Sequence, residues 1–376
     1  MIKAEGKNKL KALFFTLYDF NGASSRFRVY QYLPFLREAG IDYSVYPFYT
    51  ANFERASAKL GRCSGYLSRI FNKTYLYWKY LVRFFQILNA GKYDFVFIQK
   101  ELIPGPLLNL LIRRNAKLIF DFDDAIYLSE EEQRKIFGRV MLKGTKEKID
   151  RLLSLSRKVI VGNDFIGAYA KRYCASVVKI PIAIDTYRYP FRWKEPGKDI
   201  VLGWIGRERN VGYLERLENV FKKLAELSVE CQLLVIGVQR KKINIESLPL
   251  RSLPWSYETE IETLSGIDIG LMPLADDDWS RGKGGCKLLQ YMALGIPTVS
   301  SPVGINADII QDGINGFMAS TAEDWVEKLL LLARDGGLRG RMGKNARETI
   351  EKEFSLDRWS RIFINNIKEA AGANAG

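Results

Sequence analysis

The sequence predicts an α/β protein made of two Rossmann-like, doubly wound domains that face each other across a cleft. Its 376 residues exceed what one hydrophobic core usually serves. Short apolar segments alternate with helical patterns in both halves of the chain, which is typical of parallel sheets covered by helices on both faces. With 47% hydrophobic and 27% charged residues, the composition indicates globular domains and not a disordered chain.

The first domain is predicted over residues 1–185. Its expected strands are short and apolar, at Leu10–Thr16, Tyr43–Pro47, Phe95–Gln99, Lys117–Phe120, Lys158–Val161 and Val178–Ile180. The basic stretch Lys7–Lys11 and the apolar run Ala12–Leu17 have the look of a signal peptide. Because the run is short, lacks a small-residue cleavage site and is followed by Asp19, we interpret it as the first strand.

The second domain is predicted over residues 199–355, after a linker at Thr186–Lys198 that is rich in aromatic, basic and proline residues. Its expected strands are Ile200–Ile205, Gln232–Ile236, Ile269–Met272 and Thr298–Ser300. Helices are expected between them at Tyr213–Leu227 and Glu258–Ser265. Residues 356–376 form the terminal segment, with a helix over Leu356–Ala370 and a frayed tail from Ala371.

The composition also excludes whole classes of chemistry. The chain has no histidine, so histidine-based nucleophile systems, zincin motifs and histidine metal sites are absent. The cysteines have no paired spacing, which indicates reduced thiols in a cytoplasm; they are Cys63, Cys174, Cys231 and Cys286.

The net charge of +14 favours anionic partners such as nucleotide sugars, lipid-linked phosphates and phospholipid headgroups. A nucleic-acid-binding protein is an alternative that rests on this charge alone. Because no reading motif accompanies the charge, we expect no nucleic acid partner. No apolar run is long enough to span a bilayer.

The most informative segment runs from Asp268 to Phe317. An apolar strand leads into a glycine-rich loop, then a helix at Lys287–Ala293 ended by Gly295 and Pro297, and then a second strand. Backbone N–H groups at such a loop and helix start can face a diphosphate.

This segment resembles the donor half of the family 4 glycosyltransferases, which are retaining enzymes of the GT-B fold, also called group 1. The resemblance is carried by Gly282–Pro297, Ser301–Gly304, Asp312–Gly313 and Asn315–Phe317. It implies a UDP- or GDP-linked sugar as donor, no further cofactor and no metal. It also implies that the terminal helix of residues 356–376 crosses back to the first domain.

The resemblance assigns the diphosphate to cationic side chains and backbone amides. In the loop after the first strand of the second domain, Arg207 matches the family's arginine, and Arg209 is our substitute for its lysine. Lys287 starts a helix, where a cation opposes the helix dipole, and an anionic ligand would explain its placement. Surface arginines and solvated lysines are the alternatives. The predicted donor-site residues are Gly206, Arg207, Arg209, Lys283, Gly284, Gly285, Lys287 and Gln290.

The chain departs from the family at two positions. Family members usually carry two glutamates here, and the alignment places Gly282 and Gln290 at them. Gln290 can still hydrogen-bond ribose hydroxyls, whereas Gly282 has no side chain to do so. The missing first carboxylate removes one side-chain contact that the resemblance would assign to the donor sugar.

In the first domain, the segment Ile119–Ala125 closes a strand with three carboxylates. Asp123 and Asp124 are the predicted catalytic residues, which would bind sugar hydroxyls or support a positively charged transition state. A helix N-cap is the alternative. The triplet Asp276–Asp278 could be taken for a metal motif, but we interpret it as a solvated loop.

The loop after the first strand is the predicted acceptor contact, with Gly22 and Arg26 as its residues. Capping of the next helix by Ser24 or Ser25 is the equal alternative.

A helix over Arg69–Leu88 is predicted to bear a basic face, and its aromatic residues suit the headgroup layer of an anionic membrane. The basic face consists of Arg69, Lys73, Lys79 and Arg83. A helix that covers the sheet of the first domain is the alternative.

The sequence therefore predicts a cytoplasmic glycosyltransferase, peripheral on the inner face of the membrane, with a glycan or lipid-linked acceptor in cell-envelope or exopolysaccharide synthesis. The alternative is a catalytically silent protein of the same fold that binds a nucleotide sugar or glycan as sensor or scaffold.

Overall fold

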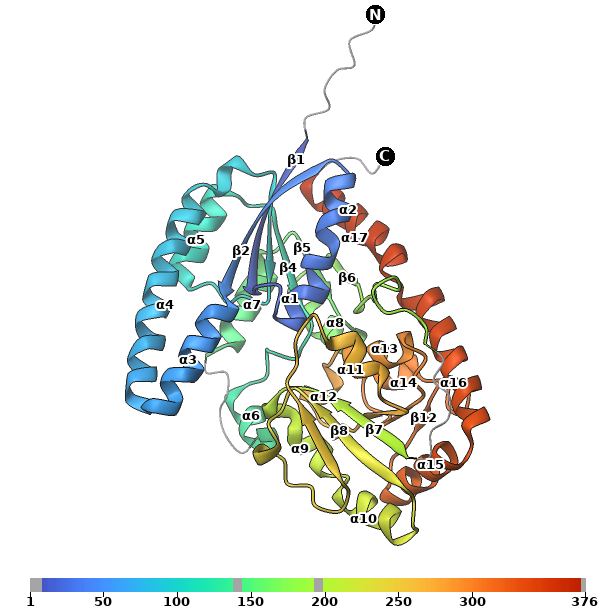
Figure 1. Ribbon diagram of the computed structural model, residues 1–376. Helices are drawn as coiled ribbons and strands as arrows, with labels where there is room; N and C mark the ends of the chain where they lie inside the picture. The colour runs from blue at the N-terminus through green and yellow to red at the C-terminus, as the bar shows by residue number, and fades with distance from the viewer. Residues whose placement is uncertain (1–8, 138–143, 193–198, 373–376) are drawn as a thin grey trace, which may run out of the picture. The chain divides into compact units, whose positions relative to one another are not determined.

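The computed structural model describes residues 9–137, 144–192 and 199–372. The chain forms two compact units (Figure 1). The first contains Met1–Pro181 and Ser360–Gly376, and the second contains Ile182–Trp359. Each unit holds a six-stranded parallel sheet with helices on its faces, which confirms the predicted class of two doubly wound domains.

The first unit has the strand order β2-β1-β3-β4-β5-β6. Its strands are β1 (Leu10–Tyr18), β2 (Ile41–Tyr49), β3 (Phe95–Gln99), β4 (Leu118–Phe122), β5 (Lys158–Val161) and β6 (Val177–Lys179). Its helices are α1 (Ala23–Arg28), α2 (Leu33–Glu38), α3 (Ala51–Cys63), α4 (Gly65–Leu88), α5 (Gly105–Arg114), α6 (Glu130–Phe137), α7 (Lys146–Leu155) and α8 (Asp164–Ala170), with 3-10 turns η1 (Tyr30–Tyr32) and η2 (Ala90–Lys92). The central strands β3, β4 and β5 are buried along their whole length, as parallel strands covered on both faces should be.

The second unit has the strand order β12-β11-β10-β7-β8-β9, which is the Rossmann order. Its strands are β7 (Ile200–Ile205), β8 (Cys231–Ile236), β9 (Leu250–Leu253), β10 (Ile269–Met272), β11 (Thr298–Ser300) and β12 (Phe317–Met318). Its helices are α9 (Val211–Glu215), α10 (Glu218–Glu226), α11 (Glu260–Ser265), α12 (Asp278–Arg281), α13 (Cys286–Ala293), α14 (Ile305–Ile309), α15 (Ala322–Arg334) and α16 (Gly336–Thr349), with 3-10 turns η3 (Glu208–Asn210) and η4 (Arg240–Lys242) and a π-helical segment at Ile350–Phe354.

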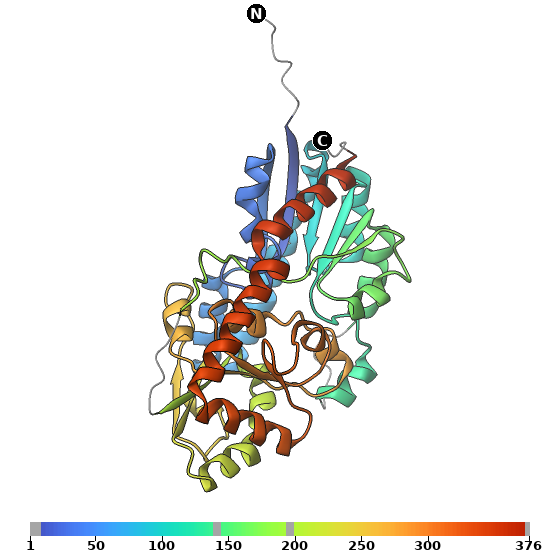
Figure 2. The same ribbon diagram turned by 90° about the vertical axis from the view of Figure 1, so that its right-hand side faces the viewer.

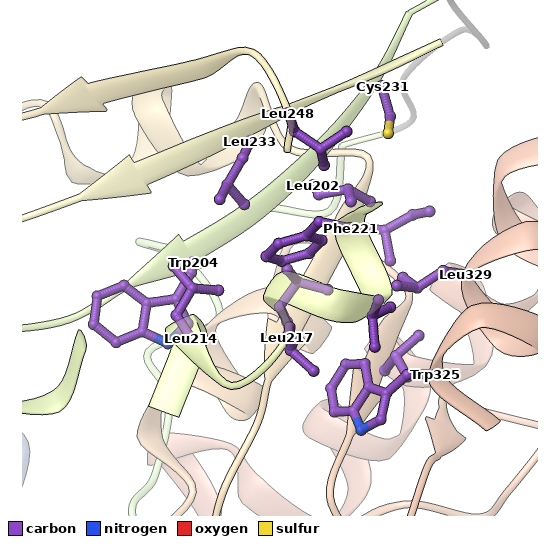
Figure 3. Packing of buried hydrophobic residues seen from close by; sticks show 14 of the residues in the cluster. Leu202, Trp204, Leu214, Leu217, Phe221, Cys231, Leu233, Leu248, Trp325 and Leu329 are labelled. Atoms are coloured by element: carbon purple, nitrogen blue, oxygen red, sulfur yellow. The ribbon is translucent and has the colours of Figure 1, made fainter. Parts of the chain in front are cut away.

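The core of the second unit lies between the sheet and helices α9, α10 and α15 (Figure 3). Trp204 and Leu233 come from neighbouring strands and meet Phe221 of α10 and Trp325 of α15 in one buried cluster. Each of these side chains is at least 95% buried.

The terminal helix α17 (Leu356–Ala371) begins in the second unit and belongs to the first from Ser360 onward. There the Phe363 ring stacks on Tyr32 at 4.2 Å and also packs against Phe97 of β3. In Figure 2 this helix is the red one that leads to the C-terminus. These contacts anchor residues 360–372 to the first sheet, although they follow the second unit in the chain.

The structure differs from the sequence-based expectations in three segments. The helix predicted over Tyr213–Leu227 is two helices, because an N–H to carbonyl bond from Leu217 to Leu214 makes a tighter turn that keeps both leucines buried. Strands β9 and β12 were not predicted; β9 is a half-exposed edge strand, and β12 has only two residues.

The predicted linker begins too early. Residues 182–192 already belong to the second unit, where Tyr189 is 1% exposed. The remainder of the linker at 193–198, the start of the basic stretch at 7–8 and the end of the tail at 373–376 lie outside the described residues.

Cys174, Cys231 and Cys286 form no disulfide, and the side chain of Cys63 lies outside the described part. Within the described residues, no helix has both the length and the apolar character needed to cross a bilayer.

Candidate functional site

The second unit presents its candidate site at the point where the strand order reverses. Strands β7 and β10 are neighbours in the sheet, and their connections leave in opposite directions. In open parallel sheets the carboxyl ends of such a strand pair form the usual ligand crevice. The loop with Gly206, Arg207 and Arg209 follows β7, and the glycine-rich loop follows β10 and α12, so the sheet order brings the predicted donor residues to one edge.

The loop after β7 is shaped by Trp204. A Cβ on Gly206 would lie 2.2 Å from the Trp204 ring, so only glycine fits where the chain passes over the indole. Arg207 and Arg209 follow in exposed positions at the start of the turn η3. An exposed guanidinium at a strand end can reach an anionic ligand.

The glycine-rich loop turns the chain into α13. Gly285 is the N-cap residue of α13 and has a φ of +68°, a left-handed conformation that side chains disfavour. A Cβ on Gly284 would lie 2.9 Å from the Ile182 side chain. Both glycines are therefore needed to let the backbone reach the start of α13.

Aromatic rings bring the two loops together. The Lys287 ammonium lies 5.1 Å from the centre of the Trp204 ring, which also underlies Gly206. The Lys283 ammonium lies 5.5 Å from the Tyr213 ring of α9, and the Tyr213 hydroxyl accepts a hydrogen bond from Ser280 at 3.0 Å. Two half-buried lysines are thus held over aromatic faces beside the Arg207 loop.

Gln290 is held in a buried polar network. Its amide Nε2 donates to the Tyr189 hydroxyl at 2.9 Å and to Glu260 Oε1 at 3.1 Å, and Glu260 also accepts from Trp255 Nε1 at 2.5 Å. Gln290 is 4% exposed. A ribose contact would have to replace one of these bonds, so that role of Gln290 stays a prediction.

The network gives a physical reason for the departure from the family pattern. A glutamate at position 290 would place a second carboxylate against Glu260 in a buried setting, where like charges repel strongly. Glutamine supplies N–H donors to Glu260 instead. Gly282, at the other departing position, is the C-cap residue of α12 and is buried.

The acidic triplet is used within the loop itself. Asp276 pairs with Arg281 at 2.7 Å, and Asp277 caps α12 by accepting the Ser280 N–H at 2.7 Å. Asp278 lies 3.3 Å from the Arg281 guanidinium. Within residues 9–137, 144–192 and 199–372, no group of three or more cysteine, aspartate or glutamate side chains is arranged to hold a metal ion.

The first unit has its own cluster at the corresponding point of its sheet, between β1 and β3. The Lys100 ammonium follows β3 and contacts Asp123 at 2.9 Å and also Asp124, both beyond the end of β4. The Ser24 hydroxyl from the loop after β1 donates to Asp123 at 2.8 Å. Three strand ends thus meet in one cluster of polar side chains.

Lys100 is held in an unusual backbone conformation. Its φ is +57°, although its N–H still bonds to the Asp121 carbonyl at 2.8 Å as part of the sheet. Burial alone would lower the pKa of the Lys100 ammonium, but the carboxylates of Asp123 and Asp124 outweigh burial and raise that pKa. A non-glycine residue in this conformation is costly, and such residues concentrate at functional sites.

The alternative interpretation of the acidic and serine residues as helix caps is wrong. The helix after β4 begins at Glu130 and is capped by Ser129, so Asp123 and Asp124 are not its N-cap. The hydroxyl of Ser24 bonds to Asp123, and that of Ser25 bonds to Gln99 at 2.7 Å.

The N-cap of α1 is Gly22, and no side chain caps that helix. A Cβ on Gly22 would lie 2.2 Å from the Tyr18 side chain, so this glycine allows close packing within the chain. The predicted acceptor residue Arg26 is 5% exposed, with its guanidinium 5.1 Å from the Phe27 ring. Acceptor contacts of Gly22 and Arg26 stay predictions.

A buried ion pair lies under the cluster. Arg28 of α1 donates through Nε to both Asp121 oxygens at 3.1 Å, and both residues are almost fully buried. Burial raises the pKa of the Asp121 carboxyl to about 6, although the Arg28 guanidinium acts in the opposite direction. This pair fixes α1 to β4 and so positions Ser24 beside Asp123.

The expectation of an exposed basic face on α4 is wrong for two residues. Lys79 donates to the Pro47 carbonyl at 2.7 Å, and Arg83 pairs with Glu101 at 2.6 Å. Both basic side chains are buried, whereas Arg69 and Lys73 are exposed. Backbone carbonyls and a buried carboxylate attract the two cations inward, and the helix turns its apolar residues outward.

Sequence reasoning missed Lys100, Trp204 and Tyr213. Lys100 carried a signal, because it is a charged residue directly after a predicted buried strand. Trp204 and Tyr213 had no such signal, because their importance depends on lysines far along the chain. Lys287 follows Trp204 by 83 positions, and Lys283 follows Tyr213 by 70 positions.

Part of the chain and its fold are similar to known proteins. Residues 185–349 match the family model described as glycosyl transferases group 1. The structure resembles a sucrose-phosphate synthase from Thermosynechococcus elongatus, with a TM-score of 0.67 and 13% identity over 97% of this chain and 100% of the other. It also resembles WaaG, a glycosyltransferase involved in lipopolysaccharide biosynthesis, with a TM-score of 0.65 and 15% identity over 95% and 99% of the two chains. The fold is therefore GT-B.

Among curated proteins, the chain is 29% identical to a trehalose synthase of Thermococcus litoralis over 160 residues, which is 39% of each chain. It is 25% identical to a GDP-Man:Man(3)GlcNAc(2)-PP-Dol alpha-1,2-mannosyltransferase of Dictyostelium discoideum over 187 residues, 48% of this chain and 32% of the relative. The matches thus span less than half the length of these relatives. Together with the family model, they show that the second unit is similar to group 1 glycosyl transferases over residues 185–349.

Proposed function

We propose that this protein is a glycosyltransferase that moves a sugar from a nucleotide diphosphate donor to a glycan or lipid-linked acceptor. One observation carries the proposal: a region that matches the group 1 glycosyl transferase model holds two lysines and a glycine-rich loop beside the Arg207 loop, at the switch point of a Rossmann sheet. A structurally similar Anabaena protein, HepE, was crystallised with UDP and glucose, with a TM-score of 0.60 and 13% identity over 96% and 100% of the two chains. UDP and GDP sugars are therefore the first donors to test.

The proposed mechanism divides the work between the units. Breaking a sugar–phosphate bond leaves negative charge on the nucleoside diphosphate, and cations with oriented amides stabilise it. The side chains of Arg207, Arg209, Lys283 and Lys287 and the amides of Gly284 and Gly285 would supply this stabilisation. In the first unit, Asp123 and Asp124 would bind sugar hydroxyls or support developing positive charge, and Lys100 would hold both carboxylates in position.

The family 4 resemblance extends the proposal to finer points. It favours retention of the anomeric configuration and catalysis without a metal ion. It also favours a role in cell-envelope or exopolysaccharide synthesis, in the cytoplasm at the inner face of a membrane.

Nucleotide binding and hydrolysis test the proposal directly. Thermal unfolding would be measured with UDP, GDP and their common sugars, followed by assays for release of UDP or GDP. We expect one nucleotide to raise the melting temperature and its sugar donor to be hydrolysed slowly. Replacing Lys283 and Lys287 by alanine should abolish the shift, whereas alanine at the exposed lysines 222 and 223 of α10 should not. No shift with any nucleotide diphosphate at millimolar concentration would contradict the proposal.

A catalytically silent binding protein is the second candidate. Gly282 and the buried amide of Gln290, in place of two carboxylates, favour it. Tight nucleotide-sugar binding with no hydrolysis and no transfer to any glycan or lipid acceptor would establish this candidate instead.

A further inference from the structure

We propose that the outward face of α4 is a membrane-binding surface that enters the headgroup layer of an anionic bilayer. Among the described residues, eight of the fifteen exposed large hydrophobic side chains lie on this one helix. They are between 36% and 74% exposed, and we call them the α4 stripe: Tyr66, Leu67, Ile70, Tyr77, Trp78, Leu81, Phe84 and Phe85.

The members of the α4 stripe lie on one side of the helix. At about 100° per residue, its members fall within an arc of about 120° on the helix. From Tyr66 to Phe85 the stripe runs for roughly 28 Å, at about 1.5 Å per residue. A set of exposed apolar side chains gathered on one side of a helix marks an interaction site, unlike single exposed residues.

The opposite face of α4 prevents the helix from burying this stripe within its own unit. Arg83 is buried with Glu101, and the Lys79 ammonium is held by the Pro47 carbonyl. The Tyr75 hydroxyl adds a bond to the Phe48 carbonyl at 2.8 Å. Rotating the helix would break all three contacts and leave Glu101 buried without its partner, so the exposure of the stripe is built into the fold.

Charge favours a bilayer over a second copy of this chain. Arg55 and Lys59 of α3 and Arg69 and Lys73 of α4 are exposed, and Glu54 is the single acidic residue between positions 51 and 88. A symmetric dimer through α4 would bring like charges together, whereas anionic headgroups complement them.

The composition and length of the helix define how it would bind. Tyrosine and tryptophan, here Tyr66, Tyr77 and Trp78, prefer the interface between headgroups and acyl chains. Because α4, although 24 residues long, is not apolar enough to span a bilayer, it would lie in the plane of the interface. This surface is independent of sugar transfer, so its test needs no donor or acceptor.

Vesicle sedimentation with the full chain tests the proposal. We expect binding to vesicles that contain phosphatidylglycerol and much weaker binding to pure phosphatidylcholine. The variant Trp78→Ser, Leu81→Ser, Phe85→Ser should lose at least about tenfold in vesicle affinity, because it removes apolar burial. The matched control is Leu227→Ser, Ile314→Ser, Leu331→Ser, which alters three similarly exposed apolar residues in the second unit and should bind like the wild type.

Two further measurements distinguish the alternatives. Brominated lipids should quench the fluorescence of the wild type, and the conservative variant Trp78→Phe should lose part of this quenching while it keeps vesicle binding. Arg69→Gln, Lys73→Gln should weaken binding at low salt more than at high salt. Equal binding of the serine variant and wild type would overturn the proposal. So would a concentration-dependent wild-type dimer that the serine variant converts to monomer, without any vesicle binding.

Discussion

Arg207 is the residue to which donor binding is most directly assigned, and its removal gives a quantitative prediction. A charge-assisted contact to the diphosphate contributes roughly 1.5–3 kcal/mol, so Arg207→Ala should weaken UDP or GDP binding by about ten- to a hundredfold. Isothermal calorimetry would measure the change. Arg334→Ala, which removes another exposed arginine at the end of α15, is the control. Unchanged affinity in Arg207→Ala would remove this residue from the site.

The cluster around Lys100 predicts separate effects on stability and turnover. Lys100→Met leaves Asp123 and Asp124 with less compensation in a largely buried setting, so unfolding free energy should fall by roughly 3–5 kcal/mol. Adding Asp123→Asn to this variant should recover part of the loss, because it removes one unpaired charge. Denaturant titration measures both changes. Additive losses in the double variant would mean that the Lys100 and Asp123 charges do not interact.

Turnover should respond to the carboxylates more than donor affinity does. Asp123→Asn and Asp124→Asn would alter groups that we propose to act on developing positive charge, so kcat should fall while nucleotide affinity stays close to that of the wild type. Near-normal kcat in both variants, with a donor and acceptor in hand, would reduce these residues to a structural role.

At the scale of elements, α4 carries a buried lysine whose titration can be followed. Burial lowers the pKa of Lys79 from 10.5 to about 8, and the nearby Arg83 acts in the same direction. Between these two pH values Lys79 is neutral in the folded protein and charged in the unfolded chain, so unfolding takes up a proton and stability should rise with pH. Lys79→Met should lack this contribution, whereas exposed Lys73→Met should keep it. Parallel stability curves for wild type and Lys79→Met at pH 8 to 10.5 would contradict the assignment.

Elements with strong local signals were predictable, and those that depend on distant partners were not. Strands such as Phe95–Gln99 and Ile200–Ile205 match the structure residue for residue, because a buried parallel strand is an unbroken apolar run. The inward turn of Lys79 and Arg83 was not predictable, since the carbonyl of Pro47 and the carboxylate of Glu101 that receive them lie elsewhere in the chain. The same holds for Gln290, whose role depends on Glu260.

At the scale of the whole molecule, the two sheets have different strand orders, but each contains a point at which the order reverses. In the first unit the order reverses between β1 and β3, and in the second it reverses between β7 and β10. Near both points lie charged side chains that could act on a substrate: Lys100 with Asp123 in the first unit, and Arg207 with Lys287 in the second. The sequence predicted the carboxylates and the donor-site cations there because a parallel sheet directs all its carboxyl strand ends to one edge.

The absence of histidine from the entire chain leads to a prediction about metals. Charge on a leaving diphosphate must be met by a metal ion or by the protein, and here lysines, arginines and backbone amides gather where the diphosphate is proposed to bind. The acidic residues Asp276, Asp277 and Asp278 are already engaged with Arg281 or with the start of α12. We therefore expect sugar transfer or donor hydrolysis to survive EDTA at full rate. Complete loss on chelation, with recovery on adding manganese, would show instead that the triplet exchanges Arg281 for a cation, and Arg281→Ala should then strengthen manganese binding.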